Sequence, residues 1–365
     1  MADAVKINFS YVKRRLNFRF EAGTSRGVMT FRDVYWIKAQ LLGESTTMGW
    51  GEAAPLPGLS PDFGPDFEKL LQEVLHQAQS QYWPTQVDSL LYVVQKIVPF
   101  TLPSLRFGLE TALLDAIHAG VKRILPNSFF DQGIPIPING LIWMGDREFM
   151  RQQIDQKLED GFSCLKMKIG AISFDTELDL LSYIRDTASS RELTLRADAN
   201  GAFSPAEAMN KLDRLASFDL HSIEQPIPVG NWEELRFLCQ QTPIPIALDE
   251  ELIGITEKEV LLDKIQPQFI ILKPTLLGGI LETKKWIELA DQRGIGWWIT
   301  SALESNIGLN AIAQLAATFP LEIPQGLGTG KLFHNNLDSP LLVHSGHLHY
   351  QQGITWEEPV DSGIH

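Results

Sequence analysis

The sequence is poor in cysteine, and it lacks any long apolar run and any excess of positive charge. Two of its 365 residues are cysteines, Cys164 and Cys239, which is too few for a disulfide framework and typical of a reducing compartment. No stretch reaches the roughly 18 apolar residues of a membrane-spanning helix, and the first residues lack the basic and apolar regions of a signal peptide. A net charge of −14 argues against nucleic acids and anionic membranes as partners. We therefore expect a cytoplasmic protein with a small-molecule ligand; the sequence does not predict its oligomeric state.

The N-terminal third predicts a mixed α+β unit. Loose alternation of aromatic and β-branched residues indicates an antiparallel meander of three strands, at residues 5–21, 34–42 and 47–53. Helical periodicity follows at residues 67–79, 87–97 and 105–121. Two loops, rich in small residues or in proline, are expected at residues 21–27 and 55–61.

Beyond residue 134 short apolar runs alternate with helical stretches. The runs lie near residues 136–139, 164–169, 194–198, 220–224, 244–248, 269–273, 296–301 and 322–326. Strands that alternate with helices are typical of parallel βα units, and eight strands are the number that closes a barrel. An open doubly wound sheet is the alternative, but the glycine-rich phosphate fingerprint expected after its first strand is absent.

The predicted fold class is therefore α/β, a TIM-like barrel with a second, α+β domain. We expect the barrel at residues 134–330 and the α+β domain at residues 1–130. Residues 340–350 are expected to form one more strand that returns to the first domain, so that residues 335–365 complete it.

Two lysines lie two residues apart on the expected strand at residues 164–169. Side chains at this spacing point to the same face of a strand, so Lys166 and Lys168 point together. One interpretation is an exposed edge strand whose lysines prevent aggregation. The other is an inward-facing pair, which requires negative charge opposite it because two buried ammonium groups are otherwise costly.

Three carboxylates lie at the ends of three consecutive expected strands. Asp198, Glu224 and Asp249 are each about one strand-helix unit apart, and the carboxyl ends of barrel strands meet at one mouth. Any one of them could be a helix cap or a surface acid. Three converging carboxylates need a positive partner, and oxygen ligands with open positions suit Mg²⁺. Glu250 and Glu251 compete with Asp249, and the pattern does not choose among them.

Another lysine, Lys273, ends the sixth strand, beyond the carboxylates, whereas Lys168 precedes them on the second. One amine could thus approach each face of a ligand held at the metal. A lysine acts as a base only if its pKa falls well below about 10.4, and a second ammonium and a nearby cation both lower it. This arrangement fits abstraction of a proton α to a carboxylate, with the metal stabilising the enediolate.

Four segments resemble those of the enolase superfamily, in its muconate-lactonizing-type subgroup with a Lys-x-Lys pair and a later lysine. They are residues 103–112, 196–200, 301–305 and 325–330. The resemblance covers nearly the whole chain and is greatest for the family of dehydratases in menaquinone and phylloquinone biosynthesis. It implies a (β/α)7β barrel with an α+β capping domain. It also implies a Mg²⁺-dependent carbon–oxygen lyase that dehydrates 2-succinyl-6-hydroxy-2,4-cyclohexadiene-1-carboxylate to o-succinylbenzoate.

The resemblance also implies a role for each candidate residue. Asp198, Glu224 and Asp249 would bind the metal, which decides among residues 249–251. Lys168 would remove the α-proton, Lys166 would contact the carboxylate and tune Lys168, and Lys273 would stabilise the enediolate from the other face. Contacts to the substrate or to these groups would come from Arg196, Asn200, Ser301 and Gly326. The loops at residues 21–27 and 55–61 would close over the barrel mouth.

Two other functions stay open. Two facing lysines also permit proton transfer on both faces of a carbon, as in an N-acylamino acid racemase or another epimerase of the same subgroup. Dipeptide epimerases of this subgroup carry an Asp-x-Asp near the last barrel strand, and residues 326–329 contain no acid, which disfavours a substrate with an α-amino group. The other alternative is a non-catalytic barrel that binds a carboxylate, but such a barrel has no reason to retain buried like charges.

Overall fold

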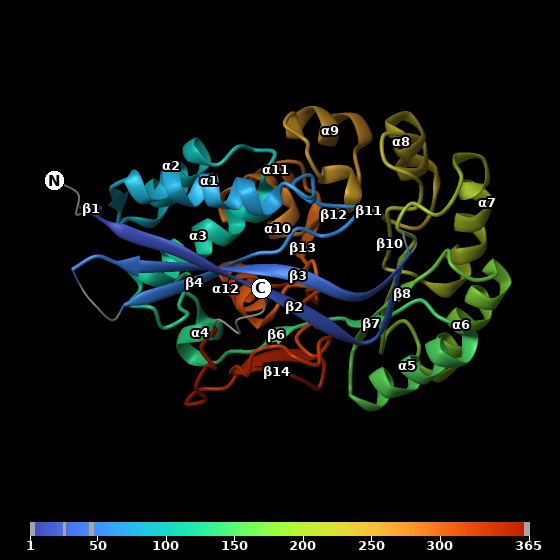
Figure 1. Ribbon diagram of the computed structural model, residues 1–365. Coiled ribbons are helices and arrows are strands. Elements are labelled where there is room, and N and C mark those ends of the chain that lie inside the picture. The colour runs from blue at the N-terminus through green and yellow to red at the C-terminus, as the bar shows by residue number, and fades with distance from the viewer. Residues whose placement is uncertain (1–3, 25–26, 44–46, 361–365) are drawn as a thin grey trace.

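The computed structural model describes residues 4–24, 27–43 and 47–360 (Figure 1). An antiparallel sheet in the order β2-β3-β4 confirms the predicted meander; its strands are β2 (Ile7–Thr24), β3 (Gly27–Leu41) and β4 (Met48–Ala53). Strands β2 and β3 form a long hairpin that reaches across to the barrel (Figure 1). Cross-strand pairs Ala22↔Met29 and Gly23↔Val28 extend it into the predicted loop. The loop prediction is therefore wrong for residues 21–24 and 27, and residues 25–26 lie outside the described chain.

Three helices cover this sheet: α1 (Phe67–Ser80), α2 (Val87–Ile97) and α3 (Pro103–Ile117). Strand β4 lies directly on the backbone of α3, because a Cβ at Gly49 would stand 2.2 Å from Ala116 N and one at Gly51 2.1 Å from Gly108 O. Only glycine permits this approach. Every residue of α3 except Ile117 is buried, so this helix forms the junction between the sheet and the barrel.

The barrel strands form a parallel sheet in the order β13-β12-β11-β10-β9-β8-β7. They are β7 (Gly140–Ile142), β8 (Cys164–Lys168), β9 (Thr194–Asp198), β10 (Ser222–Glu224), β11 (Ile246–Leu248), β12 (Phe269–Leu272) and β13 (Gly296–Ile299). The helices that alternate with them are α5 (Arg147–Glu159), α6 (Phe174–Thr187), α7 (Pro205–Leu215), α8 (Trp232–Gln241), α9 (Lys258–Ile265), α11 (Ile280–Asp291) and α12 (Asn306–Ala316). The predicted eighth strand is reduced to two parallel bridges, Ile138↔Gln325 and Thr300↔Gly326, which join β13 to the start of β7.

The last strands depart from the prediction. Residues 340–350 form a hairpin, β14 (Leu341–His344) and β15 (His347–Tyr350), rather than one strand. The hairpin pairs with β6 (Ile136–Pro137), so residues 136–137 belong to this small antiparallel sheet and the prediction that they form part of a barrel strand is wrong. Ser345 and Gly346, with φ of 46° and 68°, make the tight turn that produces a hairpin. Further on, Glu358 accepts hydrogen bonds from Trp50 Nε1 at 3.0 Å and Lys122 Nζ at 2.8 Å.

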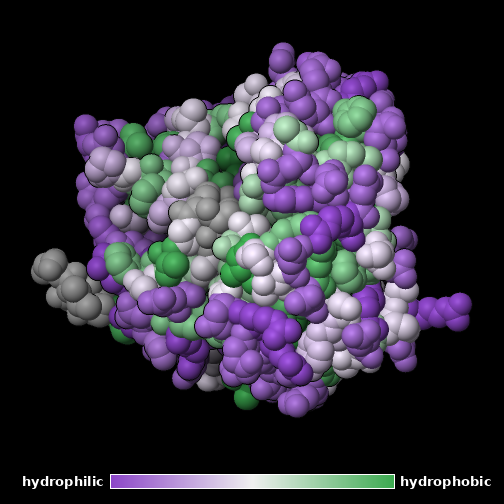
Figure 2. All heavy atoms as spheres, turned by 90° about the vertical axis from the view of Figure 1, so that its right-hand side faces the viewer, coloured by the Kyte–Doolittle hydropathy of each residue, from purple (hydrophilic) through white to green (hydrophobic). Residues whose placement is uncertain are grey.

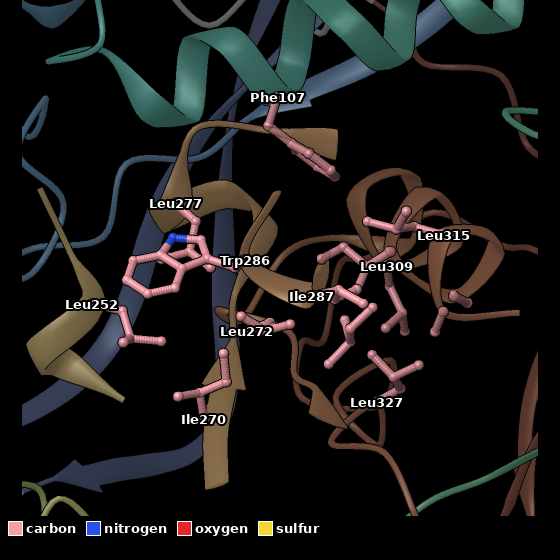
Figure 3. Close-up of a cluster of buried hydrophobic side chains, with 14 of the residues drawn as sticks. Phe107, Leu252, Ile270, Leu272, Leu277, Trp286, Ile287, Leu309, Leu315 and Leu327 are labelled. Atoms are coloured by element: carbon pink, nitrogen blue, oxygen red, sulfur yellow. The ribbon is translucent and has the colours of Figure 1, made fainter. Parts of the chain in front are cut away.

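One apolar core runs from the helices of the N-terminal third into the barrel wall. Figure 3 shows part of it, where Phe107 of α3, Leu272 of β12 and Trp286 of α11 lie among aliphatic side chains. Strand β8 is buried along its whole length, because a parallel barrel strand is covered on both faces. No helix in the described part of the chain has the length and apolar character needed to cross a membrane. The division into residues 134–330 and 1–130 with 335–365 stays a prediction.

Candidate active site

The two lysines of β8 point into the barrel. The strand lies between β7 and β9, so the interpretation as an exposed edge strand is wrong. Lys166 Nζ lies 2.8 Å from Glu224 Oε2 and 3.3 Å from Asp198 Oδ2. Lys168 Nζ lies 3.0 Å from Asp198 Oδ2 and donates to Asn200 Oδ1 at 2.7 Å. The predicted negative charge therefore lies opposite the pair.

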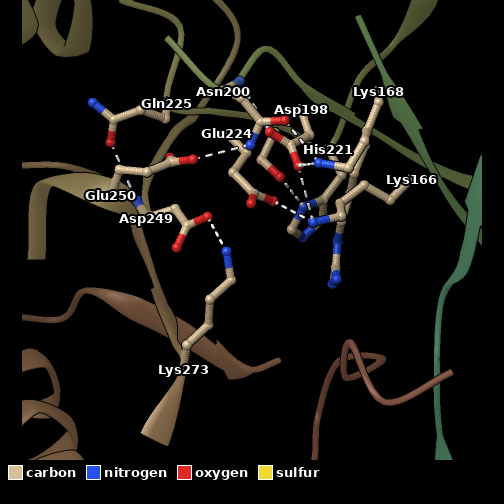
Figure 4. Close-up of polar contacts among 12 residues, drawn as sticks. Lys166, Lys168, Asp198, Asn200, His221, Glu224, Gln225, Asp249, Glu250 and Lys273 are labelled. Carbon is tan, nitrogen blue, oxygen red and sulfur yellow. Dashed lines mark hydrogen bonds and ion pairs between the residues drawn. The ribbon is translucent and has the colours of Figure 1, made fainter. Parts of the chain in front are cut away.

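Parallel register brings the acids to one level of the barrel. Asp198 and Glu224 are direct neighbours across β9 and β10, and Asp249 follows the last residue of β11. Lys273, which follows β12, pairs with Asp249. Figure 4 shows Lys166 and Lys168 entering the cluster from one side and Lys273 from the other. All the predicted lysines and carboxylates are thus brought together.

The pKa values in this cluster depend on each other. Burial opposes the charge on Lys166, but Glu224 and Asp198 outweigh it and raise the pKa of that ammonium above its usual value. Burial likewise opposes the charge on Lys273, and Asp249 followed by Glu224 raises its pKa. The pKa of Asp198 is held low by Lys168 and Lys166 in spite of burial. Burial and the neighbouring Asp198 raise the pKa of Glu224 well above its ordinary range.

The donor set fits an oxygen-preferring cation. Within the described residues, no three His, Cys, Asp or Glu side chains stand together as a preformed metal centre, since each carboxylate turns toward a lysine. Among the same residues, Glu224 Oε1 is buried and has no hydrogen-bond partner. A buried carboxylate oxygen without a partner is costly, and a cation would satisfy it. Asp198, Glu224 and Asp249 therefore fit Mg²⁺ in chemistry and position.

A cavity of about 700 Å³ opens above the cluster, a size typical of a small-molecule site. Lys166, Lys168, Asp198, Asn200 and Lys273 line its floor. Its apolar wall includes an aromatic group that joins the β2–β3 hairpin to the barrel: Phe20 lies 5.7 Å from Trp143 and 6.3 Å from Phe149 between ring centroids. Figure 2 looks onto this side of the molecule, where a recess with hydrophobic walls opens between hydrophilic surfaces.

Both segments expected to close over the mouth contribute to this cavity. Residues 27–29 of the hairpin and residues 56–59 of the proline-rich loop are part of its lining. Among the predicted contacts, Ser301 and Gly326 also line it, and Ser301 Oγ lies 2.6 Å from Thr329 Oγ1. Arg196 is not among the described lining residues; its guanidinium lies 4.0 Å from the Trp298 ring, and Nη1 donates to Pro324 O at 2.9 Å. Its predicted contact with the substrate stays a prediction.

Sequence reasoning missed Arg32, which fixes part of the cavity wall. This side chain of β3 donates from Nη1 to Ala302 O at 2.5 Å and Leu303 O at 2.7 Å, and from Nη2 to Ala54 O at 2.6 Å. Leu303 has a φ of 66°, which is uncommon for a leucine and is held in place by these bonds. No motif links residue 32 to residue 302, so no signal in the sequence could have revealed the contact.

The geometry agrees with comparisons to known proteins. The family model described as enolase C-terminal domain-like matches residues 149–356. The o-succinylbenzoate synthase of Desulfotalea psychrophila is 46% identical to this chain, covering 94% of it and 98% of the relative. The chain belongs to the o-succinylbenzoate synthase family. Within the enolase superfamily, this assignment confirms the predicted fold class and the predicted carbon–oxygen lyase.

Solved structures extend the comparison. The crystal structure of MenC from Desulfotalea psychrophila has a TM-score of 0.82 at 41% identity, covering 94% of this chain and 99% of that one. A dipeptide epimerase from Enterococcus faecalis, solved with Mg and the dipeptide L-Leu-L-Tyr, also has a TM-score of 0.82, covering 95% of this chain and 97% of that one. At 20% identity this second likeness concerns the fold. The o-succinylbenzoate synthase family thus shares its barrel and capping architecture with enzymes of other specificity.

Proposed function

We propose that this enzyme dehydrates 2-succinyl-6-hydroxy-2,4-cyclohexadiene-1-carboxylate to o-succinylbenzoate, with Lys168 as the base. The observation that carries the proposal is the approach of Lys168 and Lys273 to one group of carboxylates from opposite sides (Figure 4), on the lining of one cavity. Such an arrangement suits a carbon acid whose proton leaves on one face while negative charge develops within reach of the other.

Lys168 moves the proton in both halves of the reaction. Its Nζ, held by Asp198 and Asn200, takes the proton from the carbon α to the ring carboxylate, so that the C–H electron pair enters the enediolate. The ammonium so formed then donates that proton to the departing hydroxyl, the C–O bond breaks, and water leaves. Aromatisation of the ring makes the elimination downhill.

Positive charge around the carboxylate makes proton removal possible. Lys166, held by Glu224 and Asp198, faces the ring carboxylate, and Lys273 faces the enediolate from the other side. We assign Asp198, Glu224 and Asp249 as the groups that would hold Mg²⁺, which when bound supplies further positive charge to the enediolate. The contacts with Lys166, Lys168 and Lys273 hold these carboxylates toward the centre of the barrel.

The cavity wall excludes water from the reacting groups. Phe20, Trp143 and Phe149 present an apolar surface to the cyclohexadiene ring, and a dry site strengthens each electrostatic contact.

The location and partners of the protein belong to the same proposal. Free Cys164 and Cys239 support a cytoplasmic location, and a net charge of −14 disfavours nucleic acid as a partner.

The proposal is tested by following loss of the diene absorbance with the purified enzyme, in Mg²⁺ and after chelation with EDTA. We expect turnover with Mg²⁺, loss on chelation and recovery when Mg²⁺ is restored. An enzyme that leaves the diene unchanged under both conditions would refute the proposed function.

A further inference from the structure

Two lysines outside the carboxylate cluster line the same cavity. Lys157 lies near the end of α5, and Lys331 follows the segment at residues 326–330 that forms one wall. The other lysines of the described lining, Lys166, Lys168 and Lys273, are each paired with an acid. Within the described residues, neither Lys157 nor Lys331 forms a side-chain hydrogen bond or an ion pair. The cavity therefore has two further lining ammonium groups that form no ion pair among the described residues.

Lys157 is positioned by packing rather than by an acid. Its stem lies against Gly140, where an added Cβ would stand 3.1 Å from Lys157 Cδ and 3.2 Å from Cγ. Its Nζ lies 5.0 Å from the centroid of the Phe162 ring. Asp160 accepts a hydrogen bond from Gln156 at 3.0 Å and forms no ion pair with Lys157. A partly buried ammonium held in this way has unmet capacity for an anion.

Lys157 and Lys331 line the same cavity, and their charges interact. Burial lowers the pKa of Lys157; Asp160 opposes this shift, and the positive charge of Lys331 adds to it. Two like charges that line one cavity, on half-buried Lys157 and exposed Lys331, both gain from an anion that reaches them. The ligand chemistry that matches is a carboxylate.

We propose that Lys157 and Lys331 form an anion subsite for the second carboxylate of the substrate, the one at the end of its succinyl chain. This inference rests on the proposed function, whose substrate carries one carboxylate on the ring and another four carbons along the side chain. The ring carboxylate is directed to the Lys166 side of the cavity. The succinyl carboxylate needs a counter-charge of its own, and among the described lining residues these two lysines are the cations not paired with an acid.

The subsite predicts a specificity that depends on one end of the ligand. The segment at residues 326–330, which carries Gly326, Gly328 and Thr329 into the lining, leads directly to Lys331. A ligand that keeps the ring carboxylate but replaces the succinyl carboxylate by a methyl group loses only the contact with Lys157 and Lys331. The product o-succinylbenzoate and its analogue 2-butyrylbenzoate form such a pair.

The test is a thermodynamic cycle measured by isothermal titration calorimetry in Mg²⁺. Both ligands are titrated into the wild-type enzyme, the double variant Lys157→Met/Lys331→Met, and the control Lys69→Met, whose exposed side chain lies on α1. We expect the wild type and the control to prefer o-succinylbenzoate by about 10- to 100-fold. The double variant should bind 2-butyrylbenzoate as the wild type does, which shows that it is folded, and should lose most of the preference. Its KM should rise while kcat changes little.

The proposal is overturned if the double variant retains the wild-type preference. If the Met variant fails to bind either ligand, Lys157→Gln/Lys331→Gln repeats the cycle with less change in polarity, and the same criterion applies. If the wild-type enzyme binds neither ligand and does not turn over the diene, the proposed function itself is refuted. If the wild-type enzyme turns over the diene but the double variant keeps the ligand preference, only the proposed subsite is refuted.

Discussion

Replacement of Arg32 by methionine should weaken both the fold and catalysis. Arg32 is 1% exposed, and its guanidinium bonds to the carbonyls of Ala54, Ala302 and Leu303. Ala302 and Leu303 line the cavity, so Arg32 joins β3 of the N-terminal sheet to the wall of the barrel site. Methionine fills much of the same space but leaves the three carbonyls without donors.

The size of the effect follows from these bonds. A hydrogen bond from a charged donor is worth about 1.5–3 kcal/mol, and a buried acceptor left unsatisfied costs about 1–3 kcal/mol. Removal of a buried charge returns part of this cost, because the guanidinium no longer has to be desolvated. We therefore expect a loss of about 4 kcal/mol in the free energy of unfolding. Release of the Ala302–Leu303 carbonyls should shift the wall and lower kcat/KM by about 100-fold.

The two effects are measured by urea denaturation and by the diene absorbance assay. Arg15→Met is the matched control, because Arg15 is an exposed arginine of the adjacent strand β2 whose ion pair with Asp33, at 2.8 Å, should contribute less than about 1 kcal/mol. Arg32→Lys retains the charge and should fall between the two. An Arg32→Met enzyme with an unchanged denaturation midpoint and unchanged kcat/KM would refute the reasoning.

Three further predictions concern the cluster and the core. Lys168→Met should reduce kcat at least 1,000-fold, on the order expected when a general base is removed. The control Lys285→Met, at a half-buried side chain of α11 paired with Glu282, should leave the diene assay unchanged. Lys273→Arg should retain measurable dehydration, which needs its charge, but abolish any racemisation of an N-acylamino acid, which needs it to carry a proton; equal loss of both activities would contradict this division. Burial raises the pKa of Glu110 to about 8. Between the unfolded pKa of 4.5 and this value, the folded state keeps a proton that the unfolded state loses. The free energy of unfolding should therefore fall as pH rises toward 8, by up to about 1.4 kcal/mol per pH unit. Denaturation of Glu110→Gln between pH 5 and pH 8 should show a shallower fall than the wild type, and parallel curves would contradict the assignment.

The positions of the candidate site residues were predictable because a parallel barrel repeats one local rule. Each strand ends at the same mouth, so Lys168, Asp198 and Glu224 could be placed together from their positions at strand ends alone. Alternation within a strand also predicted that Lys166 and Lys168 share a face. These inferences use only short-range periodicity, which the sequence carries directly.

Features that depend on long-range contacts were not predictable. The loop expected at residues 21–27 is mostly strand, because its neighbours across the hairpin extend the ladder despite the glycines. Residues 341–350 form a hairpin that pairs with β6 and not the single strand predicted, because local pattern does not encode which edge a strand pairs with. The contact of Arg32 with the cavity wall and the position of Lys331 on the cavity lining depend on the tertiary fold, so the local sequence could not predict them.

A crystal structure of the enzyme with Mg²⁺ and o-succinylbenzoate would test the central claim most directly. The account predicts the ring carboxylate beside a cation held by Asp198, Glu224 and Asp249, with Lys168 Nζ and Lys273 Nζ on opposite faces of the former α-carbon. A product bound with both amines on one face, or outside the reach of Lys168, would contradict it.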